Sequence, residues 1–320
     1  MSIGDAFAGT VRGLVRHALE EEGLEVEGAT LLSLLEGYLA RPASLLRPRL
    51  LLATAESYGA DPRTVALTRL AAATELLHLF ALMHDDVLDE DGREGVELPG
   101  PPEREPSLLL TGDLLHSLAI SIIETTVEQN NLSRRILTQI RSISLRTIVG
   151  QSRDLSFLRE GSTNSLPGAR ELYRLYDLKT GYYSFVAPLT IGAIAAGSED
   201  IDGLERVGLL LGRAYQLRDD RRDSRRFIEQ GRLRAVMRWE LNLLVVLLAA
   251  EGRTSEAREI LTGEEPSPET RAVALALLDG AAGAGKLREL LLEALAAGES
   301  LEPGVSLVKR LMEIARLSLQ

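Results

Sequence analysis

The chain has 320 residues, a formal net charge of −11 at pH 7 and no cysteine. So acidic a chain is not expected to bind nucleic acid through general electrostatic attraction, and a chain without cysteine has neither disulfides nor thiolate metal sites. The stretch Met1–Gly13 lacks the basic and apolar regions of a signal peptide, and eighteen apolar residues nowhere follow one another as in a membrane span. We therefore expect a cytoplasmic protein.

The composition predicts an all-α fold. Hydrophobic residues make up 45% of the chain, charged residues 26% and aromatic residues only 4%. Leu, Ala, Glu and Arg dominate, and these residue types favour helices. Runs of β-branched residues that alternate with polar ones are almost absent, so few or no strands are expected. The length allows one large domain or two ordinary ones.

In the first half of the chain, apolar residues recur at helical spacing between breaks rich in Pro and Gly. The helix predicted at 61–82 is apolar on nearly all sides, so we expect it to be central. The elements expected here are one or two amphipathic helices at 5–39, a Pro-containing turn at 41–49, helices at 50–58 and 61–82, an exposed loop at 91–106 that is a candidate lid, and helices that begin at Gly112 and at Ser133.

The second half continues the helical pattern. Lys179 and Thr180 end a predicted helix before a break at Gly181, and Pro188 should kink or divide the apolar stretch 181–197. The elements expected here are a loop at 161–167 and helices at 171–180, 203–217, 241–250, 254–261, 269–278, 287–297 and 305–317.

The stretch His84-Asp85-Asp86-Val87-Leu88-Asp89 places three carboxylates at the end of the predicted central helix. On a helix Asp85 and Asp86 lie one turn before Asp89, so the three side chains can converge. Carboxylates held together repel one another unless a cation lies among them, and Mg²⁺ suits such oxygen ligands together with the oxygens of a substrate phosphate. The alternative is a solvated acidic helix end, since charge runs are more often surface than site.

A second cluster, Asp219-Asp220-Arg221-Arg222-Asp223, repeats this spacing after another apolar stretch. Two matching clusters favour a metal site that neutralises a diphosphate and polarises the bond between its bridging oxygen and carbon. If both clusters serve one site, the whole chain 1–320 forms a single domain.

Other candidate residues are weaker when taken alone. Lys179 and Thr180 place a cation and a hydroxyl at a helix end, but a Lys there commonly complements the helix dipole. His78 shares the helical stripe of the first cluster, yet a lone His is more often a core side chain. Five aromatic residues could wall a pocket that stabilises a cation, with core packing as the default: Phe80, Tyr182, Tyr183, Phe185 and Tyr215.

Taken together, these residues resemble the motifs of the trans-isoprenyl diphosphate synthases, also called polyprenyl synthetases, from about Arg47 to Asp223. The two acidic clusters match the two aspartate-rich motifs of that family, and Tyr215-Gln216 precedes the second as it does there. Further matches, in the order of the family, are Arg47-Pro48, His78, Gly112-Asp113, Ala119, Gly150-Gln151, Asp154-Leu155 and Lys179-Thr180.

The resemblance implies a single-domain helical bundle around a deep central cavity, and a homodimer or a heteromer. It implies that three Mg²⁺ ions bridge the aspartates to an allylic isoprenyl diphosphate, which ionises and is attacked by isopentenyl diphosphate. The aspartates concerned are Asp85, Asp86, Asp89, Asp219, Asp220 and Asp223.

The resemblance also assigns roles to other residues. Lys179 and Arg93 are expected to contact the allylic diphosphate, and Arg47 and His78 to bind isopentenyl diphosphate. Phe80, five residues before the first motif, is expected to stop the growing chain at fifteen to twenty-five carbons. Two further residues, Thr180 and Gln216, are expected to contribute to substrate binding.

The chain departs from the family at positions that would bind isopentenyl diphosphate. Ser44 stands where the family has a lysine, and Glu94 stands where it has a second arginine. The loop after Asp223 is shortened, with Gly231-Arg232 as the only remnant of its Gly-Lys pair. Losing charge-assisted contacts of this kind would weaken binding of the second substrate.

These departures leave two alternatives to the synthase. One is a class I terpene synthase, which ionises a single allylic diphosphate and needs no second substrate. The other is a non-catalytic or regulatory subunit of a heteromeric prenyl synthase. The intact aspartate motifs and Lys179 argue against the subunit, and the frequency of each activity among proteins of this kind favours the synthase over the terpene synthase.

Overall fold

The structure is a computed structural model that describes residues 3–24, 29–40, 44–88, 104–161, 166, 168–199, 201–230, 242–262 and 266–319. All regular elements among these residues are helical, so the expected all-α class is confirmed. By its internal contacts the chain divides into two compact units. The first unit is Met1–Leu137 with Ile191–Gly197, and the second is Thr138–Thr190 with Ser198–Gln320. The single domain expected over 1–320 stays a prediction.

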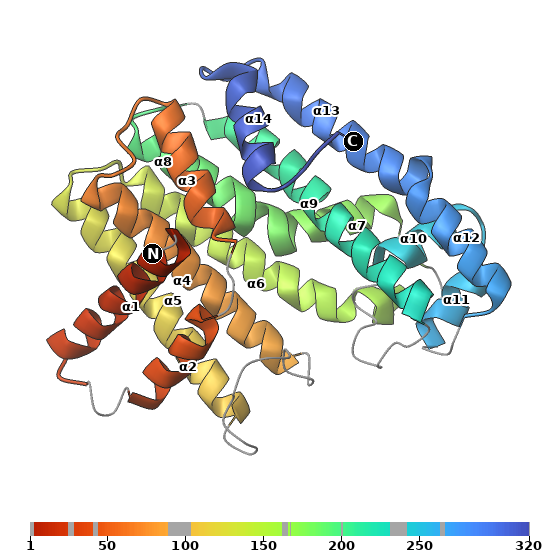
Figure 1. Ribbon diagram of the computed structural model, residues 1–320, viewed down its shortest axis with the longest axis horizontal. Coiled ribbons are helices and arrows are strands. Elements are labelled where there is room, and N and C mark those ends of the chain that lie inside the picture. Colours follow the sequence, from red (N-terminus) through yellow and green to blue (C-terminus); the bar gives the residue numbers. More distant parts are fainter. Residues whose placement is uncertain are drawn as a thin grey trace. The chain divides into compact units, whose positions relative to one another are not determined.

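The first unit is organised around the helix α4 (Figure 1). This helix packs most extensively against α5, and α3 packs on it as well. All of its residues from Leu70 to Leu76 are buried, which confirms the prediction of a central helix. The helices of this unit are α1 (Ile3–Glu21), α2 (Ala29–Leu39), α3 (Leu46–Ser57), α4 (Val65–Leu88) and α5 (Arg104–Gln129).

The helix α5 begins earlier than predicted. Two residues misled the prediction, Pro106 and Gly112. Pro106 is the third residue of the helix, where no N–H has an intrahelical partner to lose. Gly112 lies inside the helix. Glycine is needed at this position because a Cβ atom there would approach Cδ2 of His84 on α4 to 2.5 Å. The predicted loop is therefore wrong for 104–106, and its remainder, 91–103, lies outside the described residues.

Both α4 and α5 are long and apolar enough to cross a membrane by length and composition alone. In the structure they pack against each other as core helices of the first unit. Half of the most apolar window of α4 is buried, but only 33% of the corresponding window of α5. Part of the apolar surface of α5 is thus left uncovered by the described residues. The cytoplasmic location stays a prediction.

The second unit is built around the long helix α9, which packs most against η1 and α13 (Figure 1). The helix α6 has its first residues, up to Leu137, in the first unit and the rest in the second. The helix α8 has its residues up to Thr190 in the second unit and those from Ile191 in the first. The elements of the second unit, which include most of α6 and part of α8, are α6 (Arg135–Gly161), α7 (Ala169–Tyr176), η1 (Asp177–Val186), α8 (Ala187–Ala195), α9 (Ile201–Gln230), α10 (Asn242–Ala250), α11 (Thr254–Thr262), α12 (Pro268–Asp279), η3 (Ala281–Gly285), α13 (Lys286–Gly298) and α14 (Gly304–Ile314).

The predicted helix break at Gly181 is wrong. The chain continues without a break from α7 into η1, a π-helix with wider turns, and then into α8. The π-helix gives way to α-helix at Ala187, just before Pro188, which has no N–H to donate to the preceding turn. The chain stays helical there, so the kink or division expected at Pro188 stays a prediction. Wider turns of this kind are often found at functional sites.

Candidate active site

The first acidic motif lies at the C-terminal end of α4, within the first unit. Asp86 is buried, and the hydroxyl of Tyr38 on α2 donates a hydrogen bond to its Oδ2 at 2.5 Å. Asp85, one position earlier, is only half-buried. Asp89 lies outside the described residues. The two described acids therefore differ: Asp86 is anchored in the interior, and Asp85 is the one that solvent can reach.

A second group of charged side chains lies where α3 packs on α4. Arg47, in the first turn of α3, is 7% exposed, and Glu75 on α4 is 4% exposed. Burial raises the pKa of Glu75, and the nearby charge of Arg47 only partly opposes this rise. His78 is half-buried one turn after Glu75, while Ser44 is exposed just before α3. Arg47 and His78 thus belong to one unit and to two helices in contact, as binding of a shared substrate requires.

Replacing Glu75 with Gln is expected to stabilise the protein at pH 8 and to matter less at pH 5. A raised pKa means that the folded chain holds this proton more tightly than the unfolded chain does. The stability that the group contributes is full below the unfolded pKa and is lost as the pH rises through the folded pKa. Thermal melts followed by circular dichroism between pH 5 and 8 would measure the difference.

Glu124→Gln is the matched control for this change, because Glu124 is exposed on α5 of the same unit and should show no such trend. A Glu75→Gln variant that melts below the wild type at pH 8 would contradict the prediction. It would mean that the ionised carboxylate of Glu75 holds Arg47 in the native protein.

Phe80 lies in a cluster of rings between α4 and α5. Its ring centroid is 4.6 Å from that of His84 and 4.9 Å from that of His116. His84 approaches Asp113 and the carbonyl of Leu109, each at 3.3 Å. Burial lowers the pKa of His116, which favours the neutral form of this imidazole. The cluster fixes Phe80 from two sides, which suits the predicted stop for a growing hydrocarbon chain.

The second acidic motif lies on α9, within the second unit. Asp219 accepts hydrogen bonds at its Oδ1 from Nε and Nη2 of Arg218, at 3.3 and 3.1 Å, and Arg222 approaches the same oxygen at 3.3 Å. Asp223, one turn further on, pairs with Arg222 at 3.0 Å. Asp219 and Asp223 share one face of the helix and remain partly exposed.

Asp220 turns into the interior instead. It is 6% exposed and accepts hydrogen bonds from the hydroxyl of Tyr176 and from Nε2 of Gln216, the latter at 2.7 Å. Burial raises the pKa of Asp220 to about 7, although both hydrogen bonds favour its ionised form. The arrangement repeats that of the first motif. In each motif the second aspartate is buried and anchored by a tyrosine from another helix, and the first is partly exposed.

Glycines let the π-helix η1 lie close to its neighbours. A Cβ atom on Gly150 of α6 would lie 2.5 Å from the carbonyl carbon of Leu178, and one on Gly212 of α9 would lie 2.6 Å from Cα of Gly181. Only a residue without a side chain permits such backbone contact. The family match at Gly150 therefore reflects close packing of the segment that carries Lys179, and so does the glycine at position 181.

Lys179 and Thr180 extend from η1 into a polar network. Lys179 pairs with Asp154 of α6, whose other oxygen accepts a hydrogen bond from Nδ2 of Asn242 at 3.2 Å. Thr180 donates to Oε1 of Gln216 at 2.8 Å, and Gln216 donates in turn to Asp220. Hydrogen bonds thus join Thr180 and Gln216 to Asp220 of the second motif, and the charge of Lys179 acts to lower the pKa of Asp220.

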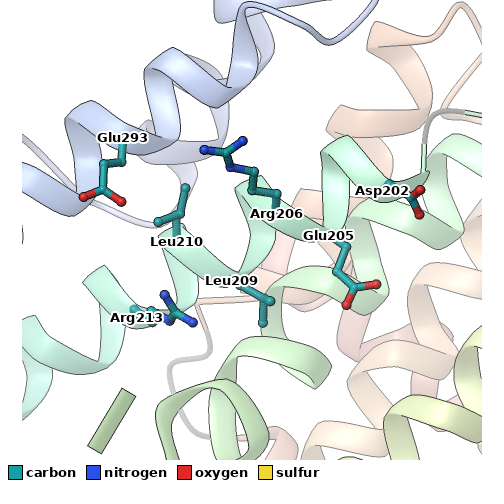
Figure 2. A pocket seen from close by; sticks show the side chains of 7 residues that line it. All are labelled: Asp202, Glu205, Arg206, Leu209, Leu210, Arg213 and Glu293. Carbon is teal, nitrogen blue, oxygen red and sulfur yellow. The ribbon is translucent and has the colours of Figure 1, made fainter. Parts of the chain in front are cut away.

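A pocket of about 530 Å³ lies between α9 and α13 (Figure 2). None of the predicted site residues lines it; its walls are Asp202, Glu205, Arg206, Leu209, Leu210, Arg213 and Glu293. Two of these residues hold η1 on α9. Arg213 makes two hydrogen bonds of 2.7 Å to Asp177, and Glu205 accepts a hydrogen bond from Tyr182 at 3.2 Å. Arg213 and Glu205 therefore help to hold the helix that carries Lys179.

The donor set of the second motif fits Mg²⁺. Among the described residues no three His, Asp or Glu side chains lie close enough together to hold a metal ion. Mg²⁺ does not require three, because it commonly takes one or two carboxylates and completes its shell with water and substrate phosphate. Asp219 and Asp223 supply two carboxylates on one partly exposed face, and no hydrogen bond from the described residues reaches Oδ2 of Asp219.

Some of the predicted site residues lie outside the described part of the chain. Other residues contact the motifs or their partners in the structure but were not predicted from the sequence. Asp89, Arg93, Glu94 and the Gly231-Arg232 pair lie outside the described residues. The sequence did not single out four residues that contact the motifs or their partners: Tyr38, Tyr176, Arg218 and Asn242. The one signal for the tyrosines is that a Tyr within an apolar helical stripe needs a partner for its hydroxyl.

Comparison with known proteins gives consistent matches. The sequence model of a family described as "Polyprenyl synthetase" matches residues 29–230. The short chain isoprenyl diphosphate synthase of Methanothermobacter thermautotrophicus is 29% identical over 205 residues, which are 63% of this chain and 61% of that protein. The match thus spans less than two thirds of that relative. The geranylfarnesyl diphosphate synthase of Natronomonas pharaonis is 27% identical over 306 residues, covering 90% and 88% of the two chains.

Among solved structures, the geranylgeranyl pyrophosphate synthetase of the archaeon Geoglobus acetivorans superposes with a TM-score of 0.73. It is 25% identical, and the alignment covers 98% of this chain and 99% of that one. The helical architecture described above is therefore one that a solved protein also has over nearly its whole length.

Proposed function

Because this chain belongs to the polyprenyl synthetase family, we propose that it is a magnesium-dependent prenyltransferase that elongates an allylic isoprenyl diphosphate with isopentenyl diphosphate. In this reaction the C–O bond of the allylic diphosphate breaks and its electron pair leaves with the diphosphate. The double bond of isopentenyl diphosphate adds to the allylic cation, and a proton is lost. The product is a trans-polyprenyl diphosphate of fifteen to twenty-five carbons, joined head to tail.

One observation carries the proposal. Both acidic motifs combine a partly exposed aspartate, Asp85 or Asp219, with a buried one that a tyrosine holds, Asp86 or Asp220. A solvated acidic helix end would have no need to bury its second carboxylate, because burial of a charge is costly. Two motifs built alike, each in its own unit, support a shared task in the same reaction.

The residues divide into contacts and anchors in this proposal. We assign metal contact to Asp85, Asp219 and Asp223, and to Asp89 by its place in the sequence. Asp86 and Asp220 hold their motifs in place, and their expected metal contact stays a prediction. Mg²⁺, when bound, would neutralise the diphosphate and stabilise the leaving group. The number of ions, expected to be three, stays a prediction.

Lys179 is proposed to bind the allylic diphosphate. Its side chain is 31% exposed even though its ammonium group is paired with the buried Asp154, so we propose that it also contacts the substrate. A cation fixed beside the leaving group stabilises charge as it develops. Arg93 is proposed for the same substrate, and Thr180 and Gln216 keep η1 and α9 in register beside it.

Arg47 and His78 are proposed to bind isopentenyl diphosphate. Both lie in the first unit, where Arg47 is largely buried and therefore held in one orientation. Ser44 remains the departure that weakens this assignment, because it is a small, exposed hydroxyl where a cation is expected. The names of the relatives favour chain elongation over cyclisation all the same.

Product analysis distinguishes the candidate functions. The protein is incubated with Mg²⁺ and geranyl, farnesyl or geranylgeranyl diphosphate, with and without isopentenyl diphosphate, and diphosphates and hydrocarbons are analysed separately. Elongated diphosphates that appear only with isopentenyl diphosphate support the proposal. Hydrocarbons or alcohols formed without it would identify a terpene synthase, and EDTA should abolish either activity.

We further propose a homodimer. Leu145, Ile148 and Val149 lie on one face of α6, and each is more than half exposed. Apolar side chains at such spacing commonly mark a surface that another chain covers. Sedimentation of the wild type should give twice the chain mass of 34.8 kDa, and Ile148→Glu should shift the mass toward one chain. A wild type that sediments as a single chain at micromolar concentration would contradict the proposal.

A further inference from the structure

Arg218 stands immediately before the second acidic motif and uses both edges of its guanidinium group. With one edge, Nη1 donates hydrogen bonds to the carbonyls of Ala315 and Arg316, at 2.8 and 3.0 Å. With the other edge, Nε and Nη2 donate to Oδ1 of Asp219, at 3.3 and 3.1 Å. The ring of Tyr215 lies 4.5 Å from the guanidinium carbon. The side chain is thus fixed on three sides.

The carbonyls that hold Arg218 belong to Ala315 and Arg316, which directly follow α14. Arg316 has a positive φ of 54°, and the N–H of Leu317 donates to the carbonyl of Met312 at 2.8 Å. This is the usual way in which a helix ends through a left-handed residue, and it leaves the last carbonyls pointing away from the helix. A cation suits that position because it also complements the helix dipole. The end of α14 is therefore a firm support for Arg218.

The contacts of Asp219 are one-sided. Both hydrogen bonds from Arg218 end on Oδ1, and the approach of Arg222 at 3.3 Å is to Oδ1 as well. No hydrogen bond from the described residues reaches Oδ2, and the side chain is 19% exposed. Two guanidinium groups thus approach one oxygen of the carboxylate, while the other accepts no hydrogen bond from the described residues.

We propose that Arg218 is a positioning residue, which anchors Asp219 to the end of α14 through Oδ1 and so presents Oδ2 to Mg²⁺. This inference rests on the proposed function, because it takes Asp219 to be a metal contact. Arg218 does not touch the metal or the substrate; it acts through the carboxylate. The C-terminal helix α14 thereby takes part in metal binding without supplying a ligand.

Simple electrostatics predicts the opposite effect for the loss of Arg218. Removing a positive charge beside a carboxylate leaves the site more negative, which by itself should strengthen binding of a divalent cation. Loss of a positioning contact should weaken it instead, since partners that orient a ligand typically change metal affinity by about 10- to 100-fold. Whether Mg²⁺ affinity rises or falls when Arg218 is lost therefore distinguishes a purely electrostatic role from a positioning role.

Arg221 supplies a matched control. It lies on the same helix, and its Nε donates at 2.8 Å to the carbonyl of Leu278, at the C-terminal end of α12. Like Arg218 it therefore holds the end of a C-terminal helix, but no hydrogen bond or ion pair joins it to Asp219 among the described residues. Arg221→Gln removes a charge, a helix cap and the 3.6 Å approach of Arg221 to Asp279, and leaves the contacts of Asp219 intact.

The experiment is calorimetric titration of Mg²⁺ into the protein in the presence of saturating inorganic diphosphate, so no turnover is needed. Arg218→Gln is expected to raise the Mg²⁺ dissociation constant about tenfold. Arg218→Lys keeps the charge but cannot contact both partners at once, so it should raise the constant as well. Arg221→Gln should stay within about twofold of the wild type, because it touches no carboxylate of the motif.

An unchanged or tighter constant in Arg218→Gln would overturn the inference, and so would full rescue by Arg218→Lys. If Arg218→Gln loses its helical circular dichroism, the Mg²⁺ dissociation constant of Arg218→Lys alone tests the inference. A wild type that binds Mg²⁺ but forms no prenyl product would contradict the proposed function alone, whereas a wild type that binds no Mg²⁺ would contradict both.

Discussion

Replacing Asp219 with Asn is expected to lower the kcat of prenyl transfer by two to three orders of magnitude, as the loss of one group that stabilises developing charge commonly does. The same is expected of Asp85→Asn. The free energy of unfolding should change little, because both side chains are partly exposed and Arg222, one of the two arginines that approach Asp219, is 67% exposed. Steady-state assays with radiolabelled isopentenyl diphosphate, together with urea unfolding, would measure both quantities.

Asp220→Asn is the internal control, because it should show a different balance of effects. Both oxygens of Asp220 accept hydrogen bonds, one from Tyr176 and one from Gln216. An Asn would turn its amide group toward one of these donors and leave it unsatisfied in the interior, at a cost of about 1–3 kcal/mol. Its unfolding free energy should therefore fall, whereas that of Asp219→Asn should not. Undiminished turnover in Asp219→Asn would remove the metal-site proposal.

Replacing Lys179 with Ala is expected to reduce kcat/KM for the allylic diphosphate by at least about a hundredfold, through loss of a cation at the developing charge. It should also destabilise the protein. Asp154 is buried and would lose its charged partner, and breaking a buried ion pair from one side costs about 3–5 kcal/mol. We expect a value near the lower end, because Asn242 still donates to Asp154.

A double variant separates these two effects. Adding Asp154→Asn to Lys179→Ala removes the unpaired charge, so the free energy of unfolding should recover most of the loss while kcat/KM stays low. Urea titration and initial-rate assays on the wild type, both single variants and the double variant would close the cycle. If stability and activity recovered together, Lys179 would have only a structural role as the partner of Asp154.

Much of the architecture could be predicted because helix formation is governed by local periodicity. The stripe that ends in the first motif predicted a buried central helix, and α4 is buried continuously from Leu70 to Leu76. The predictions failed where a local signal had a tertiary cause. Gly112 resembled a helix start, but it lies within α5, where a glycine is needed because His84 leaves no room for a side chain. Gly181 resembled a helix end, but it lies where η1 meets α9.

The candidate site shows the same division. The sequence identified the acidic motifs by residue type and spacing, and it found Lys179, Thr180 and Gln216 by resemblance. It could not distinguish Asp219 from Asp220, because adjacent carboxylates are chemically equal until a fold buries one of them. The partner of Asp220 escaped notice for a related reason: Tyr176 is remote from the motif in sequence and reaches it only through helix packing.

The sequence by itself determined that the chain is helical, that it belongs among proteins with two aspartate-rich motifs, and which side chains could hold a cation. Those properties depend on composition and on spacing within single helices. Only the tertiary structure decided which aspartate of each pair is anchored and which oxygen of Asp219 stays open, and that an arginine joins that carboxylate to the end of α14. Burial and hydrogen-bond direction are properties of helices in contact, so no single stretch of sequence contains them.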